Sequence, residues 1–274
     1  MPTLDRGDGR RRLRARGARL RLYQLVVFVA LVLLWYALTE AAVLPKFFFG
    51  EPVAVASRLR DWLGAGEIYH HVGVTLVETL LAFALGSTLA LVIGLWLALN
   101  PTASALADPY IKGLNSMPRV ILAPIFAVWF GLGIWSKVAL GITLVFFVVF
   151  FNVYQGIRDV SPVVLANSRM LGANKRQLLR TVYLPSATTW VFSSLHTSVG
   201  MAFVGAVVGE YLGSSAGVGY LILQAEGVFD INTVFAGIIV LTVCALVLDA
   251  VVGAVEERLL FWRPSQPTGE AHAT

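Results

Sequence analysis

Long apolar runs dominate this sequence and restrict it to folds in which most side chains face lipid or other helices. A helix crosses the hydrocarbon core of a membrane with about 20 apolar residues. The candidate segments are Leu22–Ala42, Val72–Leu99, Val120–Leu132, Val138–Tyr154, Thr188–Leu212 and Val234–Val255. The sequence therefore predicts an all-α polytopic membrane protein with about six transmembrane helices.

Composition supports this prediction. The chain of 274 residues is 57% hydrophobic and only 14% charged, whereas about a quarter of a soluble domain is charged. The third and fourth segments are near the lower length limit, the third contains Pro124, and a glycine-rich turn at 131–137 separates them. A single re-entrant loop formed by both segments remains an alternative.

Basic residues indicate the orientation of the chain. Eight arginines between residues 6 and 21 precede the first run. The inner loops would add Lys112, Arg119 and a cluster at 158–180, whereas the outer loops would hold Lys46, Arg58, Arg60 and Lys137. This bias predicts cytoplasmic termini and makes the arm a topology signal rather than a nucleic-acid site. The predicted parts are a cytoplasmic arm at 1–21, a transmembrane domain at 22–263 and a polar tail at 264–274.

The inner connection at about 155–187 is too long for a turn and carries two helix signals. Ser161 and Pro162 suit the start of a first helix, and Gly172 suits its end. Asn174 with Gln177 forms a capping-box pattern for a second helix, which Pro185 would end before the fifth span. An ordinary solvated loop with a basic face is the alternative.

Residue spacing in this connection resembles the "EAA" signature of binding-protein-dependent ABC transporter permeases. Gly172 is followed, after nine residues, by Val182-Tyr183-Leu184-Pro185, as in that signature. The sequence departs from it at Ala166-Asn167-Ser168, where Glu-Ala-Ala is usual. Other fragments resemble the nitrate/sulfonate/taurine branch: Met117-Pro118-Arg119, Leu122-Ala123-Pro124, the stretches 129–133, 136–137, 209–213 and 217–222, and Glu256-Glu257-Arg258.

This resemblance implies a permease subunit of an importer in the bacterial inner membrane. It would pair with a second copy, two cytoplasmic ATPase subunits that bind ATP and Mg, and an extracytoplasmic solute-binding protein. The chain itself would hold no cofactor, and its solute would be a small molecule such as a sulfonate, nitrate or similar anion. The residues implied to contact the ATPase are Ala166, Ser168, Leu171, Gly172, Ala173, Asn174, Leu184 and Pro185.

Polar residues within the spans are candidates for the translocation path, because ionisable groups in a membrane are costly. These candidates are Glu78, His196, Ser198 and Glu210. For the two acids, anchoring at the outer interface is the alternative, and for His196 and Ser198 it is hydrogen bonding between helices. Asp249 lies deeper in the sixth span, where pairing with a neighbouring helix is expected.

Enzyme chemistry is not predicted. The sequence contains no phosphate-binding G-x-x-x-x-G-K-[ST] motif and no H-E-x-x-H or G-x-S-x-G motif. ATP hydrolysis is therefore expected in a separate subunit. An ion-coupled secondary transporter or a channel that acts without an ATPase is the alternative function, and it predicts discontinuous helices near the membrane centre rather than a docking loop.

Overall fold

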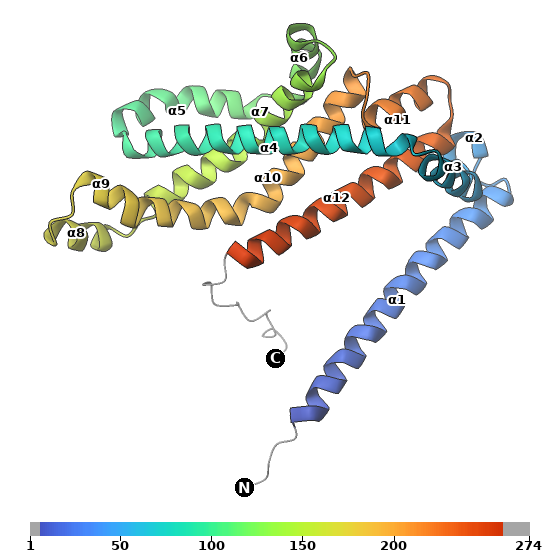
Figure 1. The fold of residues 1–274 in the computed structure, drawn as a ribbon, viewed down its shortest axis with the longest axis horizontal. Helices are drawn as coiled ribbons and strands as arrows, with labels where there is room; N and C mark the ends of the chain where they lie inside the picture. The colour runs from blue at the N-terminus through green and yellow to red at the C-terminus, as the bar shows by residue number, and fades with distance from the viewer. Residues whose placement is uncertain (1–5, 260–274) are drawn as a thin grey trace. The chain divides into compact units, whose positions relative to one another are not determined.

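The computed structural model describes residues 6–259, apart from the side chains of 6–19, 21, 187–189, 191–193, 195, 257 and 259. Helices follow one another along this whole stretch (Figure 1). In chain order they are α1 (Arg6–Glu40), α2 (Lys46–Phe49), α3 (Pro52–Ala65), α4 (Glu67–Leu99), α5 (Pro101–Ser116), η1 (Arg119–Leu122), α6 (Ala123–Phe130), α7 (Ile134–Arg158), α8 (Pro162–Met170), α9 (Lys175–Leu178), η2 (Leu179–Tyr183), α10 (Leu184–Leu212), α11 (Val218–Gly227) and α12 (Ile231–Leu259).

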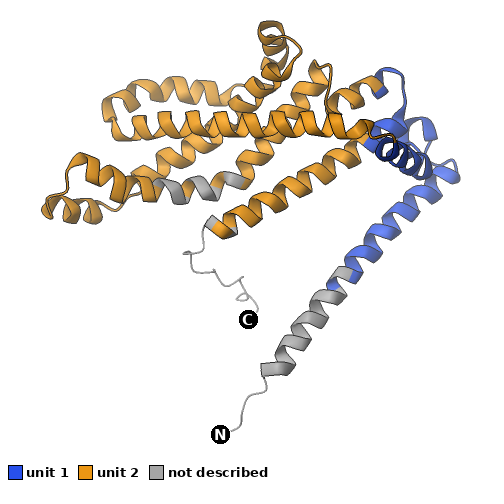
Figure 2. Cartoon of the chain, viewed as in Figure 1, with its two compact units in different colours: residues 1–64, 225–236 blue, residues 65–224, 237–274 orange. Residues whose placement is uncertain are grey.

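The chain forms two compact units (Figure 2). The first comprises residues 1–64 and 225–236, and polar contacts join its two segments. The backbone N–H of Glu51 donates to Asn232 Oδ1 at 2.8 Å, and Arg58 pairs with Asp230 at 3.1 Å. Burial alone would raise the pKa of Asp230, but hydrogen bonds from Thr233 and the charge of Arg58 hold it below its usual value.

The second unit, residues 65–224 and 237–274, is built around α4, α7 and α10. Small residues let these three helices approach closely. A Cβ atom on Gly141 of α7 would lie 2.5 Å from the Cβ of Ala82 in α4, and one on Gly205 of α10 would lie 2.5 Å from the Cα of Gly141. A buried apolar cluster that includes Val149, Phe150 and Val153 continues this contact along α7.

Among the described residues, four helices are long and apolar enough to cross a membrane, and they match the first, second, fourth and sixth predicted spans. The qualifying stretches are Leu22–Glu40, Glu67–Leu99, Ile134–Arg158 and Ile231–Glu256. The 29-residue helix α10 covers the fifth predicted span, although several of its side chains lie outside the described set.

The third predicted span, Val120–Leu132, is wrong as a continuous helix. The eight-residue α6 is about 12 Å long, too short to cross a membrane. It forms with η1 and the unpredicted helix α5 a pair of segments bent by 85°, which is either a broken span or a re-entrant loop. Pro118 explains the break, since it holds Met117 in an extended conformation and ends α5.

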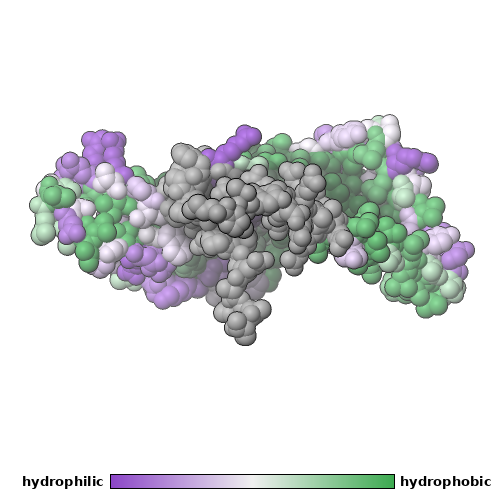
Figure 3. Space-filling view, turned by 90° about the horizontal axis from the view of Figure 1, so that it is seen from below, coloured by the Kyte–Doolittle hydropathy of each residue, from purple (hydrophilic) through white to green (hydrophobic). Residues whose placement is uncertain are grey.

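Apolar side chains cover much of the molecular surface. They include Leu25 and Phe28 on α1 and Val243, Leu246 and Val247 on α12, all of them exposed. Hydrophilic side chains gather toward the end of the second unit that carries α8 and α9 (Figure 3). Such exposure is expected of helices that face lipid or a partner in the membrane.

We expect Gly205→Ala to lower the thermal stability of the detergent-solubilised protein. The new methyl group would meet the backbone of Gly141, which cannot rotate away, so the cost should be about 1–3 kcal/mol. Gly200→Ala in the same helix is the control, because its methyl group would meet open space. Fluorescence-detected unfolding measures both, and equal melting temperatures for the two variants would contradict the packing described.

Candidate functional site

Three ionisable side chains from three different helices are buried together in the second unit. They are Glu78 of α4, Lys137 of α7 and Glu210 of α10, with exposed fractions of 1%, 0% and 0%. The two carboxyl groups interact electrostatically with each other, and Lys137 interacts with both. Burial of such groups within membrane helices marks a functional site by default.

Lys137 also caps the turn that precedes its own helix. Its Nζ donates hydrogen bonds to the carbonyl oxygens of Leu132 and of Gly133, the latter at 3.0 Å. The aliphatic part of the side chain lies against α10, where a Cβ atom on Gly209 would lie 2.9 Å from Lys137 Cγ. A glycine at this position therefore allows the lysine to lie between the two helices.

Glu210 binds the first turn of α11, directly after the loop that follows α10. Its Oε2 accepts from the backbone N–H of Gly219 at 2.7 Å, and its Oε1 accepts from Thr75 Oγ1 at 2.6 Å. The Thr75 hydroxyl in turn accepts from the backbone N–H of Val218 at 3.1 Å. One carboxylate thus holds both the loop and helix α4.

The loop is held at a second point by His71, whose Nδ1 accepts from the backbone N–H of Gly217 at 3.1 Å. Gly217 has a φ of +105°, and a Cβ atom there would lie 2.2 Å from the carboxyl carbon of Glu210. Both the conformation and the close approach require glycine.

These contacts do not favour the alternative in which Glu78 and Glu210 are anchored at the membrane interface, because both side chains are buried within the protein. Of the candidate path residues, the structure brings these two together, and it adds Lys137, Thr75 and His71, which sequence reasoning missed. The spacing of His71, Thr75 and Glu78 by four and three residues places them on one face of a helix and could have indicated the cluster.

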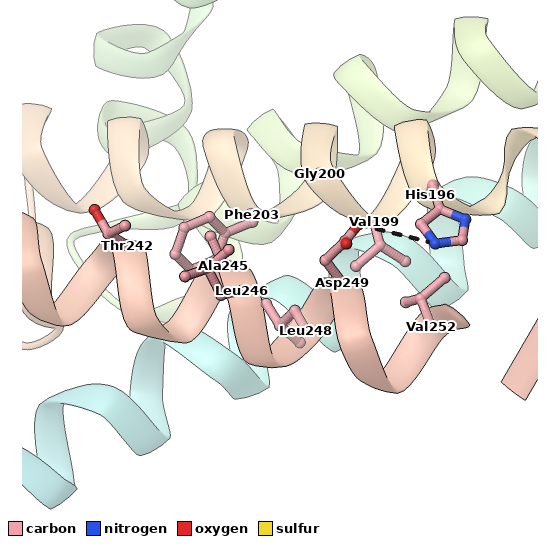
Figure 4. Close-up of a pocket in the computed structure, with 10 residues that line it drawn as sticks. All are labelled: His196, Val199, Gly200, Phe203, Thr242, Ala245, Leu246, Leu248, Asp249 and Val252. Carbon is pink, nitrogen blue, oxygen red and sulfur yellow. Dashed lines mark ion pairs between the residues drawn. The ribbon is translucent and has the colours of Figure 1, made fainter. Parts of the chain in front are cut away.

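His196 lies at a different place, a cavity of about 300 Å³ between α10 and α12 (Figure 4). Its Nδ1 is 3.0 Å from Glu256 Oε2 and its Nε2 is 3.8 Å from Asp249 Oδ1. Val199, Phe203 and other apolar residues line the remainder of the cavity. Ser198 is buried, and its hydroxyl donates to the carbonyl oxygen of Ser194 in the same helix at 2.7 Å, so it stands apart from this cavity.

The predicted inner loop forms the helix–glycine–helix bend that its sequence indicates. Helix α8 begins with Pro162 and ends before Gly172, which has a φ of +84°. The capping box is present, since Asn174 Oδ1 accepts from Gln177 N at 2.9 Å and Gln177 Oε1 accepts from Asn174 N at 2.8 Å. We call residues Ser161–Pro185 the coupling loop.

The predicted contact residues of the coupling loop lie around this bend. Ala166 and Leu171–Asn174 are exposed or partly exposed, Leu171 with 88% of its surface accessible. Leu184 and Pro185 lie farther on, in the first turn of α10.

The expectation that Pro185 ends the second helix is wrong. Helices α9, η2 and α10 follow one another without a gap, and η2 is a π-helical turn directly before Leu184. A proline has no N–H group and crowds the carbonyl four residues earlier, and a wider π turn just before it relieves both constraints.

The fold defines a polytopic helical membrane protein of the transporter class, with a buried polar cluster and an exposed coupling loop. Among solved structures, the chain is similar to the MetNI methionine ABC transporter in an inward-facing conformation, with a TM-score of 0.59 and 16% identity over 70% of this chain and 94% of that one. At this identity the similarity shows the fold.

The family follows from sequence comparison. Residues 86–261 match the model of the binding-protein-dependent transport system inner membrane component, and the chain belongs to this family of ABC transporter permeases. It is 31% identical to a putative aliphatic sulfonates transport permease of Bacillus subtilis over 88% of this chain and 87% of the relative. It is 32% identical to the riboflavin permease of Chloroflexus aurantiacus over 88% and 90%, and 26% identical to the taurine permease of Escherichia coli over 92% and 94%.

This family consists of multi-pass inner-membrane subunits that are not themselves catalytic, which work with ATP-binding subunits and a solute-binding protein. The chain is therefore the transmembrane permease subunit of an ABC importer.

We expect Lys137→Met to destabilise the protein strongly. Removing the lysine cation leaves two buried carboxyl groups without their positive partner and two carbonyl oxygens without a donor. The free energy of unfolding should fall by about 3–5 kcal/mol. Lys112→Met is the matched control, because Lys112 forms an exposed ion pair with Asp108, worth at most about 0.5 kcal/mol. The measurement is the midpoint of thermal unfolding in detergent, and a small shift for Lys137→Met would mean that the cation does not stabilise the cluster.

Proposed function

We propose that this permease works as a homodimer with cytoplasmic termini and transmits ATP-driven movement through its coupling loop. Two partner ATPases would bind ATP and Mg²⁺, so that this chain needs no cofactor of its own. Alternation between outward-facing and inward-facing states would then move the solute.

The observation that carries this proposal is the shape of the coupling loop. A capping box and a glycine with positive φ fix the bend. At the bend, Met170 and Leu171 expose 82% and 88% of their surfaces, and basic residues such as Arg169 and Lys175 lie beside them. Large apolar side chains held in an ordered, exposed turn are suited to a groove in another protein.

An ion-coupled carrier that acts alone gives no reason for such a loop. Residues 101–116 and 119–130 do form a bent pair, which that alternative predicts. However, the buried charged groups interact with one another, and Glu210 accepts a hydrogen bond from Gly219 at the start of α11, so they do not line an ion site between broken helices.

For the solute, we propose a small organic molecule, and an aliphatic sulfonate is the first candidate because relatives are named for sulfonates and taurine. The cavity beside His196 supports a second candidate. Asp249 lines it and Glu256 contacts His196, and this acidic surrounding favours a cationic nitrogen compound over an anion; other relatives are named for formylaminopyrimidine and riboflavin.

We expect Gly172→Arg to reduce the amount of ATPase that co-purifies with the permease from solubilised membranes by about tenfold or more, equivalent to about 1.4 kcal/mol. The substitution strains a backbone with a φ of +84° and places a bulky cation at the bend. Gly113→Arg is the control, because Gly113 lies in the regular helix α5 and also faces open space.

Quantitative mass spectrometry of the pull-down measures the ratio of the two proteins. Loss of the ATPase in both variants would indicate a general effect of added charge. A wild-type permease that purifies alone and transports solute in liposomes without ATP would overturn the proposal.

A further inference from the structure

Helices α7 and α10 connect the coupling loop to the buried charged cluster. The loop begins just after α7 ends at Arg158, and α10 begins at Leu184, within its last residues. Lys137 and Glu210 lie near the opposite ends of these helices, about 30 Å and about 40 Å away at 1.5 Å per residue. Figure 1 shows α8 and α9 at one end of the pair, and α6 and the start of α11 toward the other.

The two helices cannot slide past each other without a large rearrangement. Gly205 packs on the backbone of Gly141, and Gly209 packs on Lys137, with no space for even a methyl group at either glycine. Close-packed contacts of this kind transmit displacement rather than absorb it. The pair therefore acts as one lever.

The far end of this lever holds residues Gly213–Gly219, which comprise the connection after α10 and the first two residues of α11 and which we call the clamped loop. Glu210 accepts a hydrogen bond from the backbone N–H of Gly219, and its carboxyl group also fills the space beside Gly217. Thr75 completes the contact, because it donates to Glu210 and accepts from Val218. Movement of Glu210 along with α10 must carry the clamped loop with it.

We propose that Glu210 is a positioning residue of the transport cycle, whose carboxylate transmits movement of the coupling loop to the clamped loop at the opposite end of α10. The proposal rests on the function proposed above, since the ATPases supply the displacement. Thr75 supports Glu210 by a hydrogen bond, and Gly217 and Gly219 are the loop residues that Glu210 contacts. With the contact broken, ATP hydrolysis continues without moving the loop.

The test uses the native complex with its ATPase subunits in lipid nanodiscs. In a Cys244→Ser background, Ser215→Cys places a single thiol on the exposed part of the clamped loop. Its rate of reaction with a polar maleimide is compared in two states, without nucleotide and with ATP and vanadate. We expect the two rates to differ by about fivefold or more, the lower range of allosteric couplings.

In Thr75→Val and Glu210→Leu, we expect this difference to fall to about twofold or less, below that range, while the ATPase subunits remain bound and hydrolyse ATP. Glu210→Gln keeps one acceptor oxygen and should retain part of the difference. Thr88→Val is the matched control: the same change in the same helix removes a hydroxyl that donates to the Ala84 carbonyl in its own helix, at 2.7 Å, and the full difference should remain.

The outcomes separate the two proposals. If Thr75→Val and Glu210→Leu keep the wild-type difference in labelling, Glu210 does not transmit movement to the clamped loop, and the importer function stands. If no ATPase co-purifies with the wild-type protein, the proposed contact between the coupling loop and the ATPase is wrong, and the proposed role of Glu210 is wrong with it. Should Glu210→Leu not fold, Thr75→Val decides alone, because it is nearly isosteric and removes only the hydroxyl.

Discussion

The contact between α7 and α10 is the constraint on which the second unit depends. Glycines at 141, 205 and 209 bring the two helix backbones so close that the side chain of Lys137 is enclosed between them. The same proximity allows the lysine to interact with Glu210 of α10 and with Glu78 of α4. If larger residues replaced these glycines, their side chains would separate the helices, and the lysine would no longer interact with the two carboxyl groups.

Burial of three ionisable groups in membrane helices is costly. On insertion scales each costs about 2.5–3.5 kcal/mol at a helix centre. Here Lys137 donates to two carbonyl oxygens and Glu210 accepts from a hydroxyl and a backbone N–H, whereas Glu78 Oε2 has no hydrogen-bond partner among the described residues. Buried polar groups become favourable only when such partners are fixed in place, and this requirement makes the clamped loop part of the helix core rather than a free connection.

Sequence reasoning reached those features that depend on local chemistry. Runs of apolar residues locate the long helices, and the bend of the coupling loop follows from Gly172 and the Asn174–Gln177 capping box, both present as predicted. Features that depend on tertiary packing were not accessible in the same way. Glu78 and Glu210 look like interface anchors by position, because their distance from a helix end says nothing about which face meets a partner.

Prolines account for the other errors, and in opposite directions. Met117 and Pro118 end helix α5, and the third predicted span begins only after them, as the short helix η1. Pro185 looked like a terminator, yet the helix continues, because a π turn ahead of it provides room for the ring. A proline predicts a local loss of one hydrogen bond, and the neighbouring turn determines whether the helix stops or adjusts.

The departure of Ala166-Asn167-Ser168 from the family signature can be understood from the same geometry. The bend is fixed by the φ of Gly172, by the two capping-box hydrogen bonds, and by backbone hydrogen bonds to the carbonyl oxygens of Asn167 and Ser168, which do not depend on the side chains at these positions. The shape of the coupling loop therefore does not need a glutamate at position 166. An acid there would act only on a partner's surface, and this chain presents the exposed Met170 and Leu171 with neighbouring basic side chains instead. Under the function proposed above, recognition of the ATPase through this loop depends on apolar contact and positive charge, and the facing groove is expected to be apolar with an acidic rim.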